Sequence, residues 1–385
     1  MRTIGAVTVA RSDYSILRPI LRAIASEPRL RPQLIAGGTH WSGAFGETVH
    51  DIEADGFEVT ARVDAMPASD MPRDIARSIG EATSGFADVY ARCRPDVLLL
   101  IGDRFETLAA ASASLPFTIP IAHVHGGELS QGAFDEQIRH AITKLSHLHF
   151  VSAESHAQRV IQMGEEPWRV TVSGAPALDN LRLTALMPRD ELERRVGIAL
   201  VPAPLLVTFH PATLEYRRTA EQVDELIAAL EFVERPVVIT APNVDTSNAV
   251  VRDRLQRFAA ARPGVLFMEN LGTVVYWSLM AVAAAMAGNS SSGIIEAGSL
   301  GLPVVNIGSR QAGRERGPNV IDVENGRADI TTGLTRALDP AFRLGLQGMT
   351  NLYGDGCAAP RIVERLAGVT LGQELLVKRF HQVPA

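Results

Sequence analysis

Short apolar runs alternate with amphipathic stretches along the whole chain. The runs have the length and continuous hydrophobicity of buried strands. In order they are residues 4–10, 33–37, 97–102, 119–125, 147–152 and 170–172, then 205–209, 236–240, 265–268, 284–287 and 303–307. The stretches between them have helical spacing, as at residues 15–26, 72–92, 221–232 and 246–261. This alternation predicts an α/β fold with parallel sheets that are covered by helices on both faces.

The alternation is interrupted once, at a polar, proline-containing stretch around residues 186–204. It then restarts with a second set of strands and helices. The chain of 385 residues is long enough for two domains with sizeable cores. We therefore expect two Rossmann-like domains, residues 1–180 and 181–365, that face each other across a cleft.

Composition narrows the range of partners. The net charge is −6, and no block of lysine and arginine is present, so nucleic-acid and anionic-membrane binding gain no support. Only Cys93 and Cys357 occur, too few for a disulfide framework or a thiolate metal site. The chain opens on a strand-like run rather than a leader, and no apolar run has membrane-spanning length. These features predict a soluble, cytoplasmic protein.

Residues 288–296, Gly-Asn-Ser-Ser-Ser-Gly-Ile-Ile-Glu, form the most informative motif. They follow an apolar stretch and lead into a predicted helix, where free backbone N–H groups and serine hydroxyls can bind a phosphate. Glu296 lies one turn further and can reach a ribose hydroxyl. No lysine follows the loop, so it is not the phosphate loop of ATP-hydrolysing enzymes. The alternative is an ordinary serine cap of the helix.

Polar clusters follow almost every predicted strand. Ligands bind beyond the carboxyl ends of strands in open α/β sheets, so this repetition predicts a functional cleft rather than separate strand caps. The clusters are residues 11–14, 37–40, 102–106 and 123–128, with 135–140 shortly after on a helical segment, and residues 208–211, 242–245 and 308–310 in the second half.

Residue types suggest chemistry but leave alternatives open. Asp103, beside Arg104, is either an ion-paired structural carboxylate or a general base. His123 and His125 lie two apart on a predicted strand and should project from the same face, as a metal pair or as buried, hydrogen-bonded histidines. The second reading is the commoner outcome, and the pair at 147 and 149 repeats the spacing.

The remaining candidates also have two interpretations. Asp135 and Arg139 have one-turn spacing, which fits either a surface ion-pair ladder or a site. Arg11 and Arg310 can each bind a phosphate bidentately. His210, before a proline, can donate to a diphosphate oxygen or cap its strand. Packing is the expected role of three aromatic residues, Tyr14, Tyr276 and Trp277.

Taken in order, these motifs resemble those of the hydrolysing UDP-N-acetylglucosamine 2-epimerases, in the bacterial branch of sialic- and legionaminic-acid-type sugar synthesis. The resemblance spans roughly residues 4 to 368. The run Asp-Glu-Gln-Ile-Arg-His-Ala-Ile-Thr-Lys at 135–144 and the segment Gly-Arg-Glu-Arg-Gly at 313–317 are its most specific parts. The other matching segments are 11–14, 102–106, 123–128, 210–211, 242–245, 288–293, 308–312 and 353–356.

The resemblance implies a GT-B-like fold with the active site in the interdomain cleft, and a C-terminal helix at 366–385 that joins the first domain. It implies a reaction in two stages. The nucleoside diphosphate is first eliminated from C1 as the C2 proton is removed, and water then adds to the 2-acetamidoglucal to release a free N-acetylmannosamine-type sugar. No metal or nicotinamide is implied, and family members form homodimers or homotetramers.

The resemblance also assigns roles to individual residues. The catalytic set is Asp103, His125, Asp135, Arg139 and Glu128. The set that binds substrate and nucleotide is Arg11, Asp13, Tyr14, His40, Arg104, His210, Asn243, Ser290, Ser291, Glu296 and Arg310. Within the second set, Arg11, His210, Ser290, Ser291 and Arg310 hold phosphates, Glu296 holds the ribose and Asn243 lines the cleft.

Two positions depart from parts of the family. His125 stands where one branch has a carboxylate, and Glu106 stands where some relatives have aspartate. The sugar is either N-acetylglucosamine or a 2,4-diacetamido-trideoxyglucose, on UDP or GDP. A non-hydrolysing 2-epimerase is the first alternative, but it carries a Gln-His pair where this chain has Thr39 and His40. A GT-B glycosyltransferase is the second, but it does not need the run at 135–144.

Overall fold

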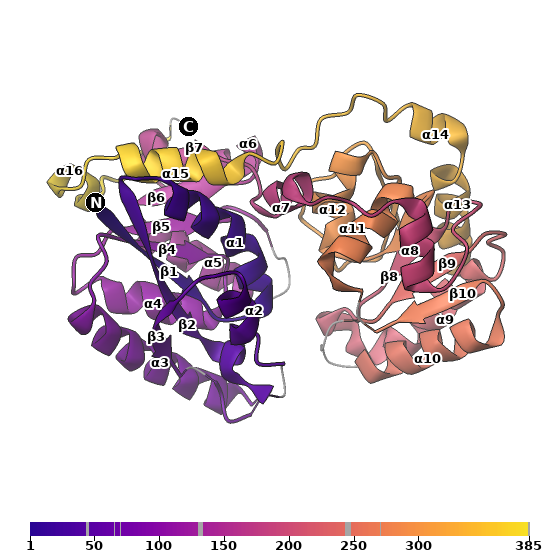
Figure 1. Cartoon of the computed structure of the whole chain (residues 1–385), viewed down its shortest axis with the longest axis horizontal. Helices are drawn as coiled ribbons and strands as arrows, with labels where there is room; N and C mark the ends of the chain where they lie inside the picture. The colour runs from indigo at the N-terminus through magenta and orange to yellow at the C-terminus, as the bar shows by residue number, and fades with distance from the viewer. Residues whose placement is uncertain are drawn as a thin grey trace. The chain divides into compact units, whose positions relative to one another are not determined.

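A computed structural model describes residues 1–43, 46–64, 66–69, 71–129, 134–242, 248–269 and 271–383. The chain divides into two compact units, which are drawn in Figure 1. Unit 1 comprises Met1–Asn180 and Tyr353–Ala385, and unit 2 comprises Leu181–Leu352. Within the described ranges, no helix combines the length and apolar composition needed to cross a membrane.

Unit 1 is built on a seven-stranded parallel sheet with the order β3-β2-β1-β4-β5-β6-β7. The chain runs outward from β1 in one direction and then from β4 in the other, so the strand order reverses between β1 and β4, where α/β sheets bind their ligands. The strands are β1 (Arg2–Thr8), β2 (Leu30–Gly37), β3 (Val59–Val63), β4 (Val97–Ile101), β5 (Ile121–Val124), β6 (Leu148–Val151) and β7 (Val170–Val172).

Helices cover both faces of this sheet. Successive residues of a strand point to opposite faces, and both Leu98 and Leu99 of β4 are fully buried, in two different cores. α1 (Arg11–Ser26) and α15 (Ala358–Gly368) cover one face, and α3 (Pro72–Arg92), α4 (Phe105–Ser114) and α5 (Asp135–Leu145) cover the other. The remaining helices are η1 (Gly38–Trp41), α2 (Val49–Ala54), α6 (Glu154–Gln162), η3 (Pro167–Arg169), α7 (Ala177–Leu183) and α16 (Gln373–Leu376).

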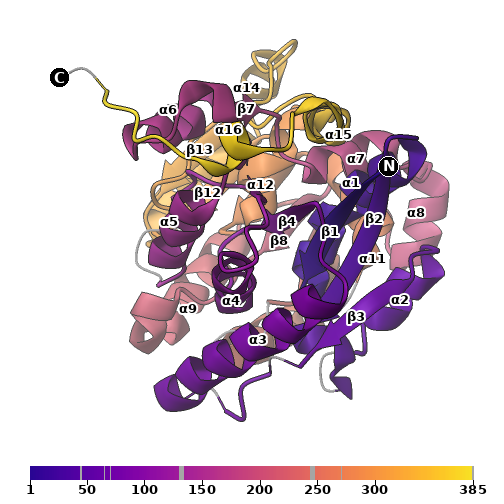
Figure 2. The ribbon, with the colours of Figure 1, turned by 90° about the vertical axis from the view of Figure 1, so that its left-hand side faces the viewer.

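The C-terminal segment from Tyr353 onward packs as part of unit 1. α15 packs against α1, and after α16 the chain continues toward α6 (Figure 2). Arg169 is buried and donates to the Leu375 carbonyl at 2.8 Å, while the His381 amide donates to the Gly164 carbonyl at 2.9 Å. The return to unit 1 falls at Tyr353, so residues 353–365 lie in unit 1, whereas the sequence predicts them in the second domain.

Unit 2 is a six-stranded parallel sheet with the order β10-β9-β8-β11-β12-β13. Its strands are β8 (Leu205–Thr208), β9 (Val237–Thr240), β10 (Val265–Met268), β11 (Ala285–Gly288), β12 (Val304–Ile307) and β13 (Val320–Val323). α9 (Thr219–Leu230), α10 (Asn248–Ala261) and α13 (Arg327–Ala337) cover one face, and α8 (Arg189–Val196) and α11 (Gly272–Val282) the other. The shorter helices are η4 (Thr213–Arg218), α12 (Ser291–Ile295), η5 (Ala297–Leu300) and α14 (Pro340–Leu344).

The α/β prediction and the two Rossmann-like folds are confirmed, and each predicted strand overlaps an observed one. Two strands, β3 and β13, escaped prediction. Both lie at the edge of their sheet, where one side is open to solvent, and both contain a charged residue, Arg62 and Asp322. Their apolar runs are therefore too short to stand out from loops.

Candidate active site

The predicted polar clusters of unit 1 gather where β1, β4 and β5 end. These three strands are neighbours in the sheet, so their carboxyl ends share one stretch of its edge. Asp103 follows β4, and His125 follows β5. Asp135 lies in the first turn of α5. Burial raises its pKa, and so does the negative charge of Asp103, which shows that the two carboxyl groups are close together.

Arg139 links these elements. It lies on α5 with a side chain only 5% exposed, and Nη2 forms an ion pair with Oδ2 of Asp103. Nη1 donates to the carbonyl of His125 at 2.9 Å. A surface ion-pair ladder along α5 is therefore the wrong interpretation for Arg139, which points into the sheet edge. Of the two alternatives for Asp103, the ion pair is present, and it leaves the carboxylate 23% exposed.

His125 leaves the sheet in an unusual conformation. β5 ends at Val124, and His125 has φ of +67°, the left-handed region that residues with a Cβ rarely adopt. The expectation that His123 and His125 project from one face of a strand is therefore wrong. His123 is fully buried, with Nε2 at 2.8 Å from the Gly102 carbonyl, so it is one of the structural histidines.

His125 and Glu128 form a buried dyad. Nδ1 of His125 lies 2.6 Å from Oε1 of Glu128, and the hydroxyl of Ser152 donates to the same oxygen at 2.8 Å. Both members are less than 10% exposed. Nε2 of His125 is buried and has no hydrogen-bond partner among the residues that the structure describes. In the neutral imidazole, a proton on Nδ1 that faces the carboxylate leaves the lone pair of the ring on Nε2.

Ser152 is a residue that the sequence analysis missed. It directly follows β6, so the rule that polar residues at strand ends line a site applies to it as well. Its hydroxyl also lies 2.9 Å from Nδ1 of His156 on α6. Ser152, which donates to Glu128, is thus itself held by the buried side chain of His156, and this fixes the position of the Glu128 carboxylate.

A second buried group lies beside this cluster. Nε of Arg104 is 3.8 Å from Oδ2 of Asp13 and 3.6 Å from Oε2 of Glu106. Burial raises the pKa of Asp13 to about 6 and that of Glu106 to about 7, although the positive charge of Arg104 opposes both shifts. Arg104 is therefore placed between two carboxyl groups at the ends of β1 and β4.

The other candidate residues of unit 1 differ in whether their polar atoms are exposed or already hydrogen-bonded within the unit. Arg11 is exposed on the first turn of α1. Tyr14 is buried and donates to Asp55 at 2.9 Å. His40 is fully buried, with its ring nitrogens 2.9 and 2.8 Å from threonine hydroxyls, and burial lowers its pKa to about 4. The polar atoms of Tyr14 and His40 are thus engaged inside unit 1, and their predicted contact with substrate gains no support.

The serine loop of unit 2 lies where β11 ends. Ser290 caps α12, and its Oγ is 2.8 Å from Oγ of Ser292. Tyr276, expected to serve in packing, also joins the loop through its hydroxyl, 2.7 Å from that of Ser292. α12 has only five residues, so its dipole is weak. The dipole of this helix therefore adds little to the binding of an anion.

Two cationic or donor side chains accompany the loop. Nη1 of Arg310, after β12, donates to the Asn289 carbonyl at 3.1 Å. His210, after β8, is buried, and burial together with the charge of Arg310 lowers its pKa to about 3. His210 is therefore a neutral hydrogen-bonding group near Arg310. Burial also raises the pKa of Glu296 to about 7.

The structure thus brings together His210, Ser290, Ser291, Arg310 and Glu296 at the carboxyl edge of one sheet. Asn243 lies outside the described residues. Within the described ranges, no group of three or more His, Cys, Asp or Glu side chains is arranged to hold a metal ion.

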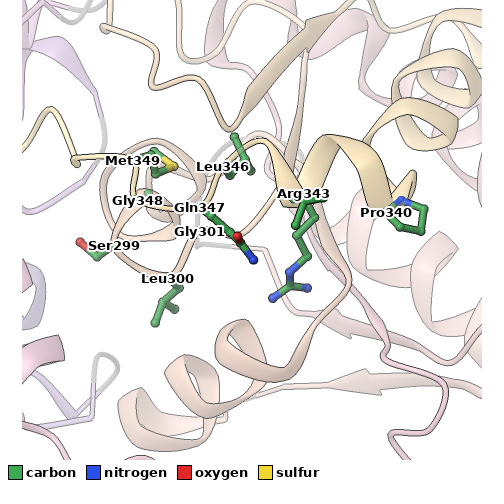
Figure 3. A pocket seen from close by; sticks show the side chains of 11 residues that line it. Ser299, Leu300, Gly301, Pro340, Arg343, Leu346, Gln347, Gly348 and Met349 are labelled. Atoms are coloured by element: carbon green, nitrogen blue, oxygen red, sulfur yellow. The ribbon is translucent and has the colours of Figure 1, made fainter.

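A separate hollow of about 530 Å³ lies on unit 2 and is lined by residues 298–301, 340, 343–344 and 346–349 (Figure 3). Arg343 reaches across it and donates to the carbonyl of Ala283 at 2.7 Å. Residues 298–301 precede β12, and Ala283, which Arg343 contacts, precedes β11, so the hollow is at the amino end of these strands. It contains none of the candidate residues.

Comparisons with known proteins agree with this picture. A family model described as UDP-N-acetylglucosamine 2-epimerase matches residues 22–367. A Legionella pneumophila protein named UDP-N,N'-diacetylbacillosamine 2-epimerase (hydrolyzing) is 37% identical over 98% of this chain and 99% of its own. A Campylobacter jejuni protein named GDP/UDP-N,N'-diacetylbacillosamine 2-epimerase (hydrolyzing) is also 37% identical, over 84% of each chain.

The fold of this chain is also similar to that of solved structures. The crystal structure of UDP-GlcNAc 2-epimerase from Neisseria meningitidis bound to UDP-GlcNAc has a TM-score of 0.79, with 20% identity over 94% of this chain and 99% of that one. The GT-B-like class of the fold, with two Rossmann-like units, is confirmed by this likeness.

Proposed function

The chain belongs to the UDP-N-acetylglucosamine 2-epimerase family, and we propose that it is a hydrolysing nucleotide-sugar 2-epimerase. The reaction converts a nucleoside-diphosphate-linked 2-acetamido sugar and water into the nucleoside diphosphate and the free 2-epimeric sugar. Unit 1 supplies proton transfer, and unit 2 binds the leaving group.

The observation that carries this proposal is Nε2 of His125, which has no hydrogen-bond partner in the described part of the chain, together with the Asp103–Arg139 pair. A C2 proton is weakly acidic, so its removal needs a base held in place and a stabilised leaving group. Nε2 of His125 takes the C2 proton, and the electron pair of the C–H bond forms the C1=C2 double bond. The C1–O bond breaks at the same time and releases the diphosphate.

Glu128 makes His125 effective as a base. Its carboxylate holds the proton on Nδ1 and stabilises the imidazolium that forms when Nε2 is protonated. Arg139 fixes the backbone of His125 through its carbonyl, and so fixes the ring relative to Asp103. His125, Glu128, Arg139 and Asp103 are therefore joined in one continuous set of hydrogen bonds and ion pairs.

Unit 2 stabilises the departing diphosphate. Ser290 and Ser291 donate from the loop after β11, and Arg310 supplies the positive charge. His210 is neutral at neutral pH and donates one hydrogen bond to a phosphate oxygen. Glu296 accepts from the ribose hydroxyls.

The second stage is hydration of the 2-acetamidoglucal. Burial and the negative charge of Asp103 raise the pKa of Asp135, which favours its protonated form, and Asp135 delivers this proton to C2 on the face opposite the one that His125 deprotonated. The oxygen of water bonds to C1, and the proton that water loses restores Asp135. Addition on the opposite face inverts C2 and releases the free sugar.

For the sugar, we propose a 2,4-diacetamido-2,4,6-trideoxyglucose on UDP or GDP. The two relatives at 37% identity carry the names of diacetylbacillosamine epimerases, whereas the Neisseria meningitidis relative named UDP-N-acetylglucosamine 2-epimerase is 28% identical. UDP-N-acetylglucosamine is the second candidate. Cytoplasmic localisation and assembly into a homodimer or homotetramer remain predictions. Light scattering coupled to gel filtration tests the oligomeric state.

Turnover in deuterated water tests the proposal. The enzyme is incubated separately with UDP-N-acetylglucosamine and with UDP- and GDP-linked N,N'-diacetylbacillosamine, and the products are analysed by NMR. We expect free nucleoside diphosphate and deuterium at C2 of a free 2-epimeric sugar. An intact 2-epimeric nucleotide sugar would identify a non-hydrolysing epimerase. A product sugar joined to an added acceptor would identify a glycosyltransferase.

A further inference from the structure

We infer that Asn289 is a positioning residue that sets His210 and Arg310 against the serine loop of unit 2. The inference deepens the proposed function, on which it rests, because it names the residue through which three phosphate-binding segments act together. These segments follow β8, β11 and β12, and Asn289 belongs to the middle one.

The side chain of Asn289 clamps the backbone of His210. Oδ1 accepts from the His210 amide at 2.7 Å, and Nδ2 donates to the His210 carbonyl at 2.8 Å. Asn289 is 3% exposed, so water does not compete for these bonds. Only a side chain with a donor and an acceptor in one plane makes both contacts, and the carboxamide is the group of this size that does so.

The backbone of Asn289 reaches the other two segments. Its amide donates to the Thr208 carbonyl at 3.1 Å, at the end of β8. Its carbonyl accepts from Nη1 of Arg310 at 3.1 Å and from Nε2 of Gln311 at 2.9 Å. Side chain and backbone therefore each use a donor and an acceptor, and together they join His210 to Arg310 through a single residue.

The close approach of the loop to β8 is built into the fold. Gly288 has φ of +133°, and a Cβ at this position would lie 2.0 Å from the Thr208 carbonyl oxygen. The chain thus needs glycine at 288 to bring residue 289 against β8. Pro211 follows His210 and has no amide hydrogen, so the clamp satisfies the last backbone donor before the proline.

Asn289 therefore fixes the spacing of the side chains that bind the departing diphosphate. His210 and Arg310 stabilise the charge that develops on one diphosphate only if both are correctly spaced from Ser290. A displacement of about 1 Å at such a site lowers the rate about a hundredfold. Loss of the Asn289 side chain should therefore remove the contribution of His210 without removing the imidazole itself.

A double-mutant cycle tests the coupling. The variants are Asn289→Ala, His210→Ala and the double variant, and the measurements are kcat for diphosphate release, Kd for UDP and for GDP, and Tm. We expect Asn289→Ala to lower kcat about ten- to a hundredfold, and the double variant to be no worse than His210→Ala. Losses that multiply, or wild-type kcat in Asn289→Ala, would overturn the inference.

Asn306→Ala is the matched control. Asn306 is another buried asparagine of unit 2, on β12, and its side chain donates to Asp322 of β13 at 2.6 Å. Its loss should lower Tm and leave the effect of His210→Ala unchanged. If Asn289→Ala does not fold, Asn289→Ser retains a donor and an acceptor in a shorter side chain and replaces it in the cycle.

A ligand-independent measurement separates this inference from the proposed reaction. The imidazole NMR signals of His210 in the free protein should move in Asn289→Ala and stay in place in Asn306→Ala. Unmoved signals with normal turnover would contradict the inference alone. Moved signals in a protein that turns over none of the nucleotide sugars would contradict the proposed reaction alone.

Discussion

Replacing Glu128 with glutamine isolates the charge of the His125 dyad. Glutamine has nearly the same size as glutamate, so the buried site stays filled. Oε1 of Glu128 now accepts from His125 at 2.6 Å and from Ser152 at 2.8 Å. In the variant, a neutral amide replaces the carboxylate that faces the imidazolium during the reaction. The expected result is loss of turnover with little loss of nucleotide affinity.

The size of the effect follows from the burial of the pair. Hydrogen bonds to charged groups contribute about 1.5–3 kcal/mol, against about 0.5–1.5 kcal/mol for neutral ones. Both residues are less than 10% exposed, so solvent screens the difference only weakly. A loss of about 1–2 kcal/mol at the transition state lowers kcat about 5- to 30-fold. An amide that turns its nitrogen toward Nδ1 inverts the tautomer, and the loss then approaches about 10⁴-fold.

The assay combines kcat for diphosphate release with deuterium incorporation at C2 and calorimetric titration of UDP. Glu154→Gln, an exposed change at the start of α6 in the same unit, is the control and should behave as wild type. Wild-type kcat in Glu128→Gln would refute the role of the dyad. A parallel fall in kcat, UDP affinity and Tm would make Glu128 a structural residue instead.

Three further changes probe separate parts of the site. Asp103→Asn should abolish turnover and leave UDP binding nearly intact, because Asp103 and Arg139 belong to unit 1; loss of both activities would make Asp103 structural. Arg310→Ala should weaken UDP binding about tenfold or more, the effect of losing a charge-assisted hydrogen bond, and unchanged affinity would remove Arg310 from the site. Burial raises the pKa of Glu106 from 4.5 to about 7. The protonated side chain is therefore compatible with the folded state below pH 4.5, and the free energy of unfolding falls as pH rises through 7 and the buried carboxyl ionises. Glu106→Gln should therefore raise Tm relative to wild type at pH 8 by the equivalent of up to about 3 kcal/mol, and should change Tm little at pH 4; an equal difference at both pH values would contradict the shift.

The ends of the predicted strands correctly located the polar residues that the structure gathers at one edge of each sheet. Asp103, His210 and Ser290 each follow a predicted strand, and parallel topology brings such positions to one edge of a sheet. The same rule does not separate residues that face a ligand from residues that face the protein. Tyr14 and His40 also follow strands, but the hydroxyl of Tyr14 and the ring nitrogens of His40 bond to side chains from other segments of unit 1.

Other features depend on contacts between distant residues. Asn289 and His210 are 79 positions apart, and no local pattern pairs them. The left-handed backbone of His125 is likewise invisible to spacing rules, which place it on the face of its strand. Ser152 is a different case, because its position after a strand was available and only its partner, Glu128, was not.

The division of unit 1 between the two ends of the chain has a consequence for biosynthesis. All the proposed catalytic and binding residues precede Tyr353, so a ribosome makes the whole active machinery before it makes α15. Until then, the apolar face of α1 and β1 lacks Ile362 and Leu366, which cover it in the folded protein. Truncation after Leu352 should therefore abolish activity without removing one reacting group, because residues that follow Leu352 complete the core of unit 1.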